Sequence, residues 1–566
     1  MPPKYSRELS EPVAHGPRLR DQFRTSPCEH ACPAGNSIQK MQALAEKGEF
    51  SEALRYLRAK NPFPGVTGRV CPHFCMDNCN RSNMEGCVNT RALERACADF
   101  AACGSGRFRN RPATGKKIAI AGGGPAGLTS AYFLALLGHE ATVYEARSVL
   151  GGLPRYGVPN FRLPRYIVDR EVGQILEHGV RALVNTRVGE DISLAEIRAR
   201  HDAVIIATGL IRENSLPIPG ADAAVRACEF LHDSAMGFNH HQIGETVVVM
   251  GGGGVGFDCA FTARRLGAKN VHVICLEKEG EMRAPAEDIE QAAREGIQIH
   301  PSCTMSGIRV ENGKVTAADY FRVRECSFDE KGKLSLVPEP DGESTLPCDT
   351  VIFAVGMKPD LDFLLSECPD LALTPRKWIQ VDEKQATSQA GIFAAGDISA
   401  GPASIARAIG DGRRAAFAAH AWLTGEDPGV FVFNDEGILE GRPQMAGLHD
   451  PYVVPLSEIY GIDQYGRANP QKEKLNDCEK SFAELNLGFT ADQAMAEAAR
   501  CFHCGHCKGC GTCVDDCPGY VLEMKIIGEL EKPFVEFGDE CWHCGNCRTS
   551  CPTGAIAFSF PLRMRV

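Results

Sequence analysis

Eight cysteines near the C-terminus form two copies of one spacing pattern. In each copy the cysteines follow C-x2-C-x2-C-x3-C, and a proline comes directly after the last one. The copies are Cys507, Cys510, Cys513 and Cys517 before Pro518, and Cys541, Cys544, Cys547 and Cys551 before Pro552. The repeated spacing indicates a metal-binding domain, and it constrains the last block of the chain, residues 491–566, more than any other feature of the sequence.

This spacing resembles the ligand runs of bacterial two-cluster ferredoxins, in which the fourth cysteine of each run ligates the cluster of the other run. The resemblance implies two [4Fe–4S] clusters, one on Cys507, Cys510, Cys513 and Cys551, the other on Cys541, Cys544, Cys547 and Cys517. Zinc ribbons also use C-x2-C pairs, but one zinc ion needs four ligands and has no use for two repeats that each end in Cys-Pro. Cys501 and Cys504 precede the first run. They are either part of an additional site or an accessory pair, and the sequence does not distinguish these two alternatives.

Length and composition set the broad class. The chain has 566 residues, 44% of them hydrophobic and 23% charged, as expected for a globular protein of roughly three to four domains. Its formal net charge of −11 argues against nucleic-acid binding, because neutralising phosphates requires a basic face. The sequence shows neither the apolar core of a signal peptide nor a run of the ~20 apolar residues of a membrane span. We therefore expect a protein of the reducing cytoplasm, whose 26 cysteines are thiols or metal ligands.

The segment KKIAIAGGGPAGLTSAYFLALLGHEATVYEA, residues 116–146, predicts a strand, a glycine-rich turn, a helix and a second strand. Gly122, Gly124 and Gly127 allow the tight turn, the close approach of backbone N–H groups to a pyrophosphate, and helix-on-strand packing. Glu145 ends the second strand, where a carboxylate can accept hydrogen bonds from ribose hydroxyls. These features in register predict a dinucleotide site.

A second copy, ETVVVMGGGGVGFDCAFTARRLGAKNVHVICLE, spans residues 245–277. It repeats the arrangement with Gly251, Gly253, Gly256 and the strand-end Glu277. Two such sites in one stretch of alternating strands and helices, residues 115–425, predict two different bound dinucleotides.

Two further motifs resemble the two-dinucleotide flavoprotein reductases. The sequence IIATG, with Thr208, matches the hinge at which the FAD domain passes toward an inserted nucleotide domain. The pair Gly396-Asp397 ends a later strand; in that family the carboxylate lies on the ribityl chain of the flavin, and the next helix points its N-terminus at the isoalloxazine. The resemblance implies FAD at the first loop and a nicotinamide nucleotide at the second.

The stretches GRVCPHFC and GGLPRYGVPNFRLP, the second beginning with Gly151 and Gly152, resemble the small (β) subunit of glutamate synthase and related flavin-containing NAD(P)H:ferredoxin oxidoreductases. The resemblance covers about residues 25–425 and implies that Gly152 contacts the cofactor. Residues 110–425 contain no C-x-x-C pair, which disfavours a dithiol reductase of the thioredoxin-reductase kind. The scattered cysteines there are expected to be small buried side chains: Cys228, Cys259, Cys275, Cys303, Cys326, Cys348 and Cys368.

The choice of nucleotide depends on the segment CLEKEGEMRA, residues 275–284. NADPH-using members of the family clamp the 2′-phosphate with a pair of arginines, whereas this chain has Leu276 and Glu277 at those positions. A carboxylate favours two free ribose hydroxyls and repels a phosphate, so we expect NADH. Lys278 and Arg283 leave NADPH open.

Five N-terminal cysteines also match family positions: Cys28, Cys32, Cys71, Cys75 and Cys79. The resemblance implies iron–sulfur clusters here. Other members have a further C-x-x-C before the position of Cys28, which this chain lacks, so one N-terminal cluster is expected. A second would need Cys87 or a non-cysteine ligand such as Glu94, which aligns with the carboxylate or amide that some relatives use. Cys97 and Cys103 are expected to be structural.

The expected fold class is α/β, with an N-terminal helical iron–sulfur domain, two Rossmann-like domains and a C-terminal ferredoxin-like α+β domain. The expected divisions are residues 1–112 (helical), 113–240 with 350–425 (FAD), 241–349 (nicotinamide nucleotide), 426–490 (linker or covering arm) and 491–566 (ferredoxin).

The leading functional hypothesis is an oxidoreductase that moves electrons between NADH and, through FAD and [4Fe–4S] clusters, a partner redox enzyme or ferredoxin, as a subunit of a larger complex. No acid–base catalytic residue is predicted. The alternatives are an NADPH dehydrogenase subunit like that of glutamate synthase, and an electron-wire scaffold whose nucleotide loops have degenerated. A flavoenzyme acting directly on a small molecule is disfavoured, because the chain offers no further barrel-sized domain for a second flavin.

Overall fold

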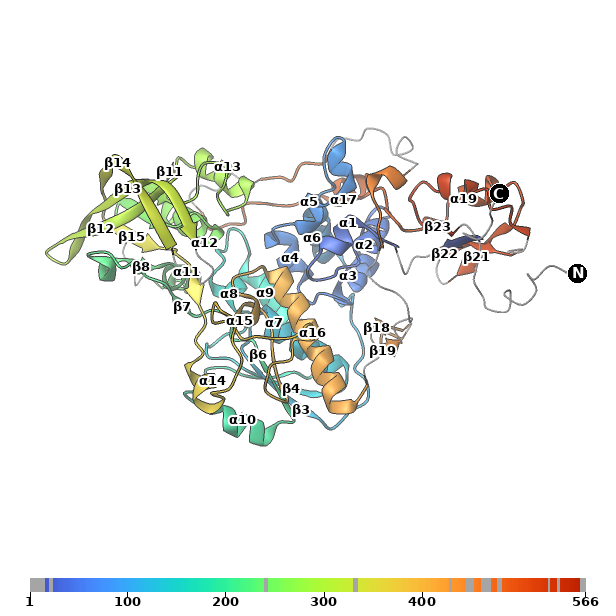
Figure 1. Ribbon diagram of the computed structural model, residues 1–566, viewed down its shortest axis with the longest axis horizontal. Helices are drawn as coiled ribbons and strands as arrows, with labels where there is room; N and C mark the ends of the chain where they lie inside the picture. Colours follow the sequence, from blue (N-terminus) through green and yellow to red (C-terminus); the bar gives the residue numbers. More distant parts are fainter. Residues whose placement is uncertain are drawn as a thin grey trace, which may run out of the picture.

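The computed structural model describes residues 16–19, 24–238, 243–328, 334–426, 430–434, 436–442, 452–459, 470–475, 481–527, 530–536 and 540–559. Four parts follow from its sheets and helices (Figure 1): an N-terminal helical domain, a first and a second Rossmann domain, and a C-terminal cysteine domain. This arrangement agrees with the fold class predicted from the sequence. The domain limits given above stay predictions.

The N-terminal helical domain packs short helices around Met41, Leu57 and Leu93, whose side chains are fully buried. The apolar spacing of residues 37–60 predicts a helical segment, and the structure divides it into two helices because Gly48 adopts a positive φ of 75° between them. The elements are α1 (Pro27–Ala31), α2 (Ile38–Ala45), α3 (Phe50–Arg58), α4 (Pro64–Val70), α5 (Phe74–Asp77), the 3-10 turn η2 (Asn80–Asn83) and α6 (Thr90–Phe100).

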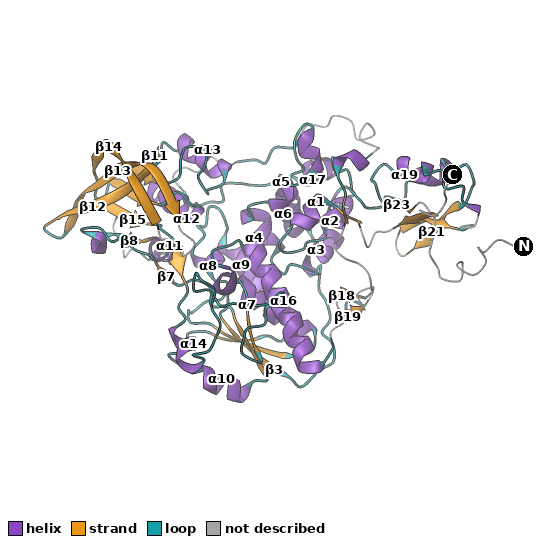
Figure 2. Cartoon of the chain, viewed as in Figure 1, coloured by secondary structure: helices purple, strands orange, loops and turns teal. Residues whose placement is uncertain are grey.

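The first Rossmann domain is a parallel sheet of order β17-β6-β3-β4-β5 with helices on both faces. Helices α7, α9 and α16 cover one face, and α10 and α14 cover the other (Figure 2). The strands are β3 (Lys117–Ala121), β4 (Glu140–Tyr144), β5 (Arg181–Leu183), β6 (Ala203–Ile206) and β17 (Ile392–Ala394). The helices are α7 (Pro125–Leu136), α8 (Leu153–Tyr156), α9 (Arg165–Leu176), α10 (Leu194–Arg200), α14 (Asp362–Glu367), α15 (Asp397–Ala400) and α16 (Ile405–Thr424).

The second Rossmann domain has a parallel sheet of order β11-β10-β9-β15-β8. Helices α11 and α12 cover one face, while an antiparallel sheet, β12-β13-β14, covers the other. The strands are β8 (Val225–Arg226), β9 (Thr246–Met250), β10 (Asn270–Ile274), β11 (Gln298–His300), β12 (Cys303–Glu311), β13 (Lys314–Phe328), β14 (Leu334–Pro347) and β15 (Thr350–Phe353). The helices are η3 (Ala221–Ala223), α11 (Ala227–Met236), α12 (Gly254–Arg265) and α13 (Ala286–Arg294).

Short strands and ion pairs join these domains. Strands β7 (Arg212–Glu213) and β16 (Met357–Lys358) pair where the chain passes between the two Rossmann domains. Arg162 of the first domain contacts Asp258 at 2.8 Å and Asp288 at 2.9 Å in the second. The N-terminal α6 reaches the same domain through a bidentate pair between Arg91 and Glu287. The second Rossmann domain is therefore held by charged contacts from two other parts of the chain.

The described parts of the segment after α16 run over the other domains as a covering arm. Phe433 stacks on Phe108, and the backbone N–H of Leu485 donates to the carbonyl of Phe161. The elements of this arm are β18 (Val430–Phe433), β19 (Leu439–Arg442), β20 (Tyr452–Val453), which pairs with β2 (Arg24–Thr25), and η4 (Leu456–Glu458).

The C-terminal cysteine domain is small and mixed. It contains α18 (Thr512–Asp515), the hairpin β21 (Leu522–Ile527) and β22 (Leu530–Val535), α19 (Asn546–Thr549) and β23 (Ile556–Ser559), which pairs with β1 (Gly16–Leu19) near the N-terminus. The helix before it, α17 (Ala491–Ala498), packs instead on α2 and α6 of the N-terminal helical domain (Figure 1). The polypeptide from α17 to residue 505 thus joins two parts of the molecule that are far apart in sequence.

Candidate functional site

The first glycine-rich loop joins β3 to α7 and leaves no space for side chains at two of its glycines. A Cβ on Gly127 would lie 2.0 Å from the carbonyl oxygen of Gly122, and a Cβ on Gly122 would lie 2.3 Å from that of Ala207. Gly122 also has a φ of 108°. The loop therefore keeps its backbone close to the sheet and opens the N-terminus of α7 toward a ligand.

Glu145 follows β4 and closes the same site from the side. Its Oε2 accepts from the backbone N–H of Gly123 at 2.8 Å, and its Oε1 accepts from that of Arg147 at 2.8 Å. The carboxylate is thus fixed beside the loop, where the hydroxyls of an adenosine ribose would lie in a dinucleotide site of this type.

A cavity of about 910 Å³ opens in front of this loop. It is lined by nearly all the residues that the sequence places at the first dinucleotide: Gly122, Gly124, Glu145, Gly152, Thr208, Gly396 and Asp397. Gly127 packs beneath the loop instead. Within the described part of the chain, the buried hydroxyl of Thr208 has no hydrogen-bond partner, which suits a polar group of a bound cofactor. Burial raises the pKa of the Asp397 carboxyl to about 6.

Helix α16 begins at this cavity and extends away from it. Ser404 caps the helix by accepting from the backbone N–H of Arg407, and Ile405 and Ala408 line the cavity. The first turn of a twenty-residue helix therefore presents its positive end to the bound group. The donor set, the open loop and the size of the cavity fit FAD.

The second glycine-rich loop repeats the geometry of the first. A Cβ on Gly256 would lie 2.0 Å from the carbonyl oxygen of Gly251, as for Gly127 and Gly122. A Cβ on Gly252 would lie 3.1 Å from Oε2 of Glu277, and the corresponding distance from Gly123 to Oε2 of Glu145 is 3.0 Å. Glu277 thus occupies the position of a ribose-binding carboxylate in the second site.

Three of the five predicted N-terminal cysteines surround one small cavity together with Glu94: Cys32, Cys71 and Cys75. We call this the N-terminal cysteine cavity. Glu94 is buried, and its Oε1 accepts from Asn36 at 3.0 Å, Asn61 at 3.0 Å and Thr67 at 2.6 Å. These donors hold the carboxylate in place, while burial raises its pKa to about 7. Three thiols and a fixed carboxylate form a suitable donor set for a [4Fe–4S] cluster.

The other two, Cys28 and Cys79, lie beside this cavity and pack with Cys501 and Cys504. No ligand set could be assigned to Cys501 and Cys504 from the sequence. Cys97 is buried in the helical core, Cys87 is half-buried, and Cys103 is exposed.

The C-terminal cysteines gather in two sets. One cavity is lined by Cys507, Cys510, Cys513 and Cys551, and another by Cys517, Cys541, Cys544 and Cys547. Burial, together with negative charge on Cys551, Cys507 and Cys510, raises the pKa of the Cys513 thiol to about 12. Such thiols ionise only when a metal centre supplies positive charge. The fourth cysteine of each run thus lies with the first three of the other.

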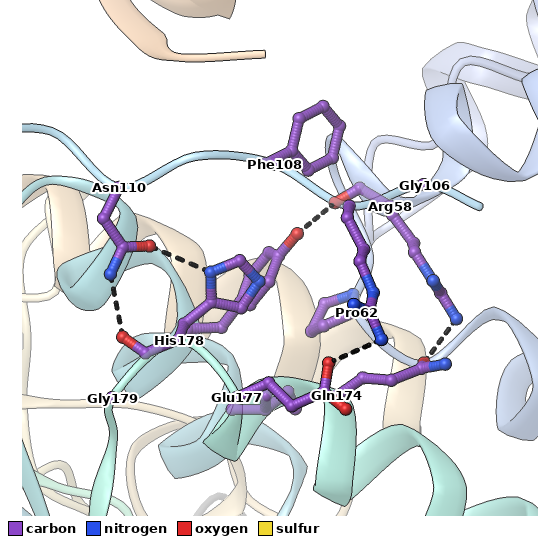
Figure 3. A pocket seen from close by; sticks show the side chains of 12 residues that line it. Arg58, Pro62, Gly106, Phe108, Asn110, Gln174, Glu177, His178 and Gly179 are labelled. Carbon is purple, nitrogen blue, oxygen red and sulfur yellow. Dashed lines mark hydrogen bonds and ion pairs between the residues drawn. The ribbon is translucent and has the colours of Figure 1, made fainter. Parts of the chain in front are cut away.

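A second cavity, of about 640 Å³, lies between the N-terminal helical domain and α9 (Figure 3). Its polar side chains pair with one another: Arg58 with Gln174, and Asn110 with His178, whose Nδ1 lies 2.9 Å from Asn110 Oδ1. Neither a glycine-rich loop nor a cysteine lines it. This cavity lies at an interface between domains and lacks the features of a cofactor site.

Comparison with known families agrees with this division of the chain. The pyridine nucleotide-disulphide oxidoreductase family matches residues 116–412. The family described as dihydropyrimidine dehydrogenase domain II, 4Fe-4S cluster, matches residues 21–104, and the 4Fe-4S dicluster domain matches residues 506–555. The cofactor classes predicted from the sequence, FAD with a nicotinamide nucleotide and [4Fe–4S] clusters, are thereby confirmed.

Several characterised proteins are similar over most of the chain. The β subunit of NADP(+)-dependent formate dehydrogenase from Moorella thermoacetica is 35% identical, covering 85% of this chain and 71% of the relative. The β subunit of NADPH-Fe(3+) oxidoreductase from Geobacter sulfurreducens is 32% identical, covering 86% and 76%. The small chain of NADPH glutamate synthase from Escherichia coli is 32% identical, covering 74% and 93%. These relatives are named as subunits of oxidoreductases.

Solved structures show weaker likeness. FprA from Mycobacterium tuberculosis in complex with NADPH aligns with a TM-score of 0.47 and 17% identity over 69% of this chain and 99% of that chain. Thioredoxin reductase from T. acidophilum aligns with a TM-score of 0.42 and 23% identity, covering 54% of this chain and 98% of that chain. Over the described residues, none of the helices combines the length and apolar character that crossing a bilayer requires. On its family match and its relatives, this chain belongs to the pyridine nucleotide-disulphide oxidoreductases, among the iron–sulfur flavoproteins related to the glutamate synthase small chain.

Proposed function

We propose that this chain oxidises NADH and delivers the electrons, one at a time, to a partner redox enzyme or a ferredoxin in the cytoplasm. FAD supplies the exchange between a two-electron hydride and single electrons. The chain itself binds the two nucleotides, orients them and places thiolates along a path away from the flavin. The formal net charge of −11 predicts no nucleic-acid partner.

One observation carries this proposal: the first turn of α16 lines both the flavin cavity and the N-terminal cysteine cavity. Ile405 and Ala408 face the first cavity, and Ala406 lines the second. The helix is held against the cysteine segment, since the Arg413 guanidinium donates to the carbonyls of Ala34 and Lys60 at 2.7 Å each. A single helical turn therefore separates the flavin site from the nearest set of cluster ligands.

We assign the ligand roles on this basis. The first cluster is held by Cys32, Cys71, Cys75 and Glu94. The two sets of the C-terminal cysteine domain hold two more clusters. In the second of these sets Cys544 is exposed, and the neighbouring Trp542 is 69% exposed. This edge is where we expect an electron acceptor to dock.

The preference for NADH rests on Glu277, which lies beside the second loop as Glu145 lies beside the first. A 2′-phosphate would be placed next to a carboxylate, whereas two free hydroxyls could donate to it. The three relatives described above are named for NADP(+) or NADPH, so an NADPH-linked function is the second candidate.

The test is anaerobic mixing of the purified chain with NADH or NADPH. We expect NADH to bleach the flavin absorbance and to produce the electron paramagnetic resonance signals of reduced clusters. Reduction by NADPH alone would overturn the nucleotide preference. Reduction by neither nucleotide, in protein with full FAD and iron, would support the scaffold alternative and refute the proposal.

A further inference from the structure

Among the thiols that the three ligand sets above leave unassigned, four lie close together: Cys28, Cys79, Cys501 and Cys504. The side chains of Cys28, Cys501 and Cys504 are 8%, 5% and 6% exposed. The first two cysteines of this group lie within the N-terminal family match, residues 21–104. Cys501 and Cys504 lie outside it and also outside the dicluster match, which begins at residue 506. Neither family therefore assigns a role to the group as a whole.

The segment that carries Cys501 and Cys504 is fixed to the N-terminal helical domain by hydrogen bonds of the buried Arg500. Arg500 contacts Glu497 at 2.5 Å, and its guanidinium donates to the carbonyl oxygens of Cys87 at 3.0 Å and Gly86 at 2.7 Å. The buried Arg81 donates in turn to the carbonyl of Arg500. Each buried guanidinium is thus paired, and the backbone at residue 500 is fixed to the segment that follows Cys79.

The histidines after Cys501 extend this attachment. Nε2 of His506 lies 3.0 Å from a carboxylate oxygen of Glu29 in α1, and Nε2 of His503 lies 3.6 Å from one of Glu46 at the end of α2. The position of Cys504 between them is therefore set by the same helical domain that carries Cys28.

Side-chain amides contact three of the four thiols. The buried Gln39 donates to Sγ of Cys28 at 3.5 Å, and its Oε1 lies 3.6 Å from Sγ of Cys501. Asn80, next to Cys79, donates to Sγ of Cys504 at 3.4 Å. Further donors reach the same sulfurs: the backbone N–H of His503 lies 3.3 Å from Cys501, and Oγ of Ser26 lies 3.1 Å from Cys28. Hydrogen bonds to sulfur are the contacts that tune iron–sulfur ligands.

The thiols are also close enough to affect one another's ionisation. Burial raises the pKa of the Cys501 thiol, and negative charge on Cys28, Cys504 and Cys79 raises it further. Burial likewise raises the pKa of Cys504 to about 11, with Cys79 adding to the shift. The four thiols are therefore near neighbours in the interior of the protein.

A single zinc ion does not fit the spacing. Zinc holds sulfur at about 2.3 Å, so tetrahedral ligand sulfurs lie only about 3.8 Å apart. Among the residues that the structure describes, no three His, Cys, Asp or Glu side chains meet closely enough to hold one metal ion. The same holds for the described cysteines of the dicluster domain, residues 506–555, which also form no group suited to one metal ion. A [4Fe–4S] cluster spreads its ligands around four irons and accounts for this.

We propose that Cys28, Cys79, Cys501 and Cys504 bind a further [4Fe–4S] cluster, assembled from both ends of the chain. It lies between the N-terminal cysteine cavity and the C-terminal cysteine domain: Cys75 of the cavity is an electrostatic neighbour of Cys28, and Cys504 is three residues from Cys507. Bound by these cysteines, the cluster would supply one-electron transfer between the flavin side and the C-terminal domain, and two such transfers would carry the electrons of one hydride. This relay role rests on the proposed function; the existence of the site does not.

The experiment compares full-length wild-type protein, purified anaerobically, with the double variant Cys501→Ala/Cys504→Ala. The wild type should hold about sixteen irons and as many acid-labile sulfides per chain, and the double variant about four fewer. FAD content should stay the same, and one reduced-cluster signal should disappear from the electron paramagnetic resonance spectrum. Unchanged iron in the double variant, or one zinc per chain in the wild type, would overturn the proposal.

Two more variants separate ligand loss from misfolding. Cys87→Ala removes a half-buried thiol from a residue whose backbone carbonyl accepts from Arg500, and this variant should keep all the iron of the wild type. Cys28→Ala should lose the same four irons as the double variant, and combining the two should lose no more. A combined loss of about eight would place the thiols in different sites. Should the double variant fail to fold, a fully reconstituted wild type with about twelve irons per FAD would still refute the proposal.

A separate measurement tests the proposed role of this cluster in relaying electrons. With NADH, the double variant should bleach its flavin at the wild-type rate, while electron delivery to an added ferredoxin should fall at least tenfold. Wild-type delivery by a variant lacking four irons would overturn the relay. Failure of both nucleotides to bleach the flavin would refute the proposed function, whereas the iron count would still decide the site.

Discussion

Replacing Glu277 with alanine tests the nucleotide preference most directly. In the structure, a Cβ placed on Gly252 would lie 3.1 Å from Oε2 of Glu277, and one placed on Gly123 would lie 3.0 Å from Oε2 of Glu145. The two carboxylates therefore have matching positions beside their loops. The carboxylate of Glu145 accepts two backbone hydrogen bonds in the first site, and ribose hydroxyls would donate to Glu277 in the second. The alanine variant should therefore bind NADH less well and NADPH better.

The magnitudes follow from charge and hydrogen bonding. A hydrogen bond to a charged group contributes about 1.5 to 3 kcal/mol, so NADH should lose roughly tenfold or more in kcat/KM. A carboxylate about 5 Å from a 2′-phosphate repels it by about 1 to 3 kcal/mol per charge pair at effective dielectric constants of about 80 to 20. Removing it should improve NADPH by roughly fivefold or more. The ratio of the two nucleotides should shift by about 50-fold or more.

The assay is steady-state reduction of a one-electron dye with each nucleotide, together with flavin bleaching in single turnover. Glu279→Ala removes an exposed carboxylate two residues away and should leave the ratio within about twofold of wild type. Glu145→Ala should instead lower FAD retention, since it disturbs the first loop. If Glu277→Ala changes neither nucleotide, or if the wild type already prefers NADPH, the assignment of Glu277 as the selecting residue is wrong.

Three further changes have expected outcomes. Glu94→Ala should lose the cluster of the N-terminal cysteine cavity while Glu94→Gln keeps it, as measured by iron content; equal retention would contradict its role as a ligand. Burial lowers the pKa of His139 to about 4, so the folded protein keeps this imidazole neutral while the unfolded chain takes up a proton below about pH 6.5. The free energy of unfolding should therefore fall by about 1 kcal/mol as the pH drops to 5.5. In His139→Asn, thermal melts should show a smaller dependence of stability on pH over this range. Arg162→Met leaves Asp258 and Asp288 without their cation and should cost about 3 to 5 kcal/mol, part of which Asp258→Asn should restore. An unchanged unfolding midpoint would show that this contact contributes little.

The nucleotide-binding loops were predictable because all their determinants lie within about thirty residues. Strand, turn, helix and terminal carboxylate follow one another, so the positions of Gly122 and Glu145 relative to one another are fixed by local geometry. The fold class followed from the same local patterns. The division of residues 37–60 into two helices was missed, because apolar spacing continues across the turn at Gly48.

The grouping of the N-terminal cysteines could not be predicted from spacing. Cys28 and Cys32 are four residues apart, yet the structure places them in different sets, since α1 ends between them and the backbone at Cys32 is extended. The role proposed for Cys501 and Cys504 depends on the packing of α17 on α2 and α6, which involves residues nearly 400 or more positions away. The sequence did contain a signal: one C-x-x-C is missing before Cys28, and one is in excess before Cys507.

Ligands of neighbouring proposed clusters lie only three or four residues apart in the chain, and this limits the distances over which electrons must pass. Cys28 and Cys32 are four residues apart and belong to neighbouring sets; the same is true of Cys75 and Cys79, and of Cys513 and Cys517. Three residues separate Cys504 from Cys507. A chain extends by at most about 3.6 Å per residue, so these Cα atoms lie within about 11 to 14 Å of one another however the domains are placed. Sequence spacing therefore keeps successive clusters close, and it does so most strictly between Cys504 and Cys507, where the C-terminal cysteine domain joins the rest of the molecule.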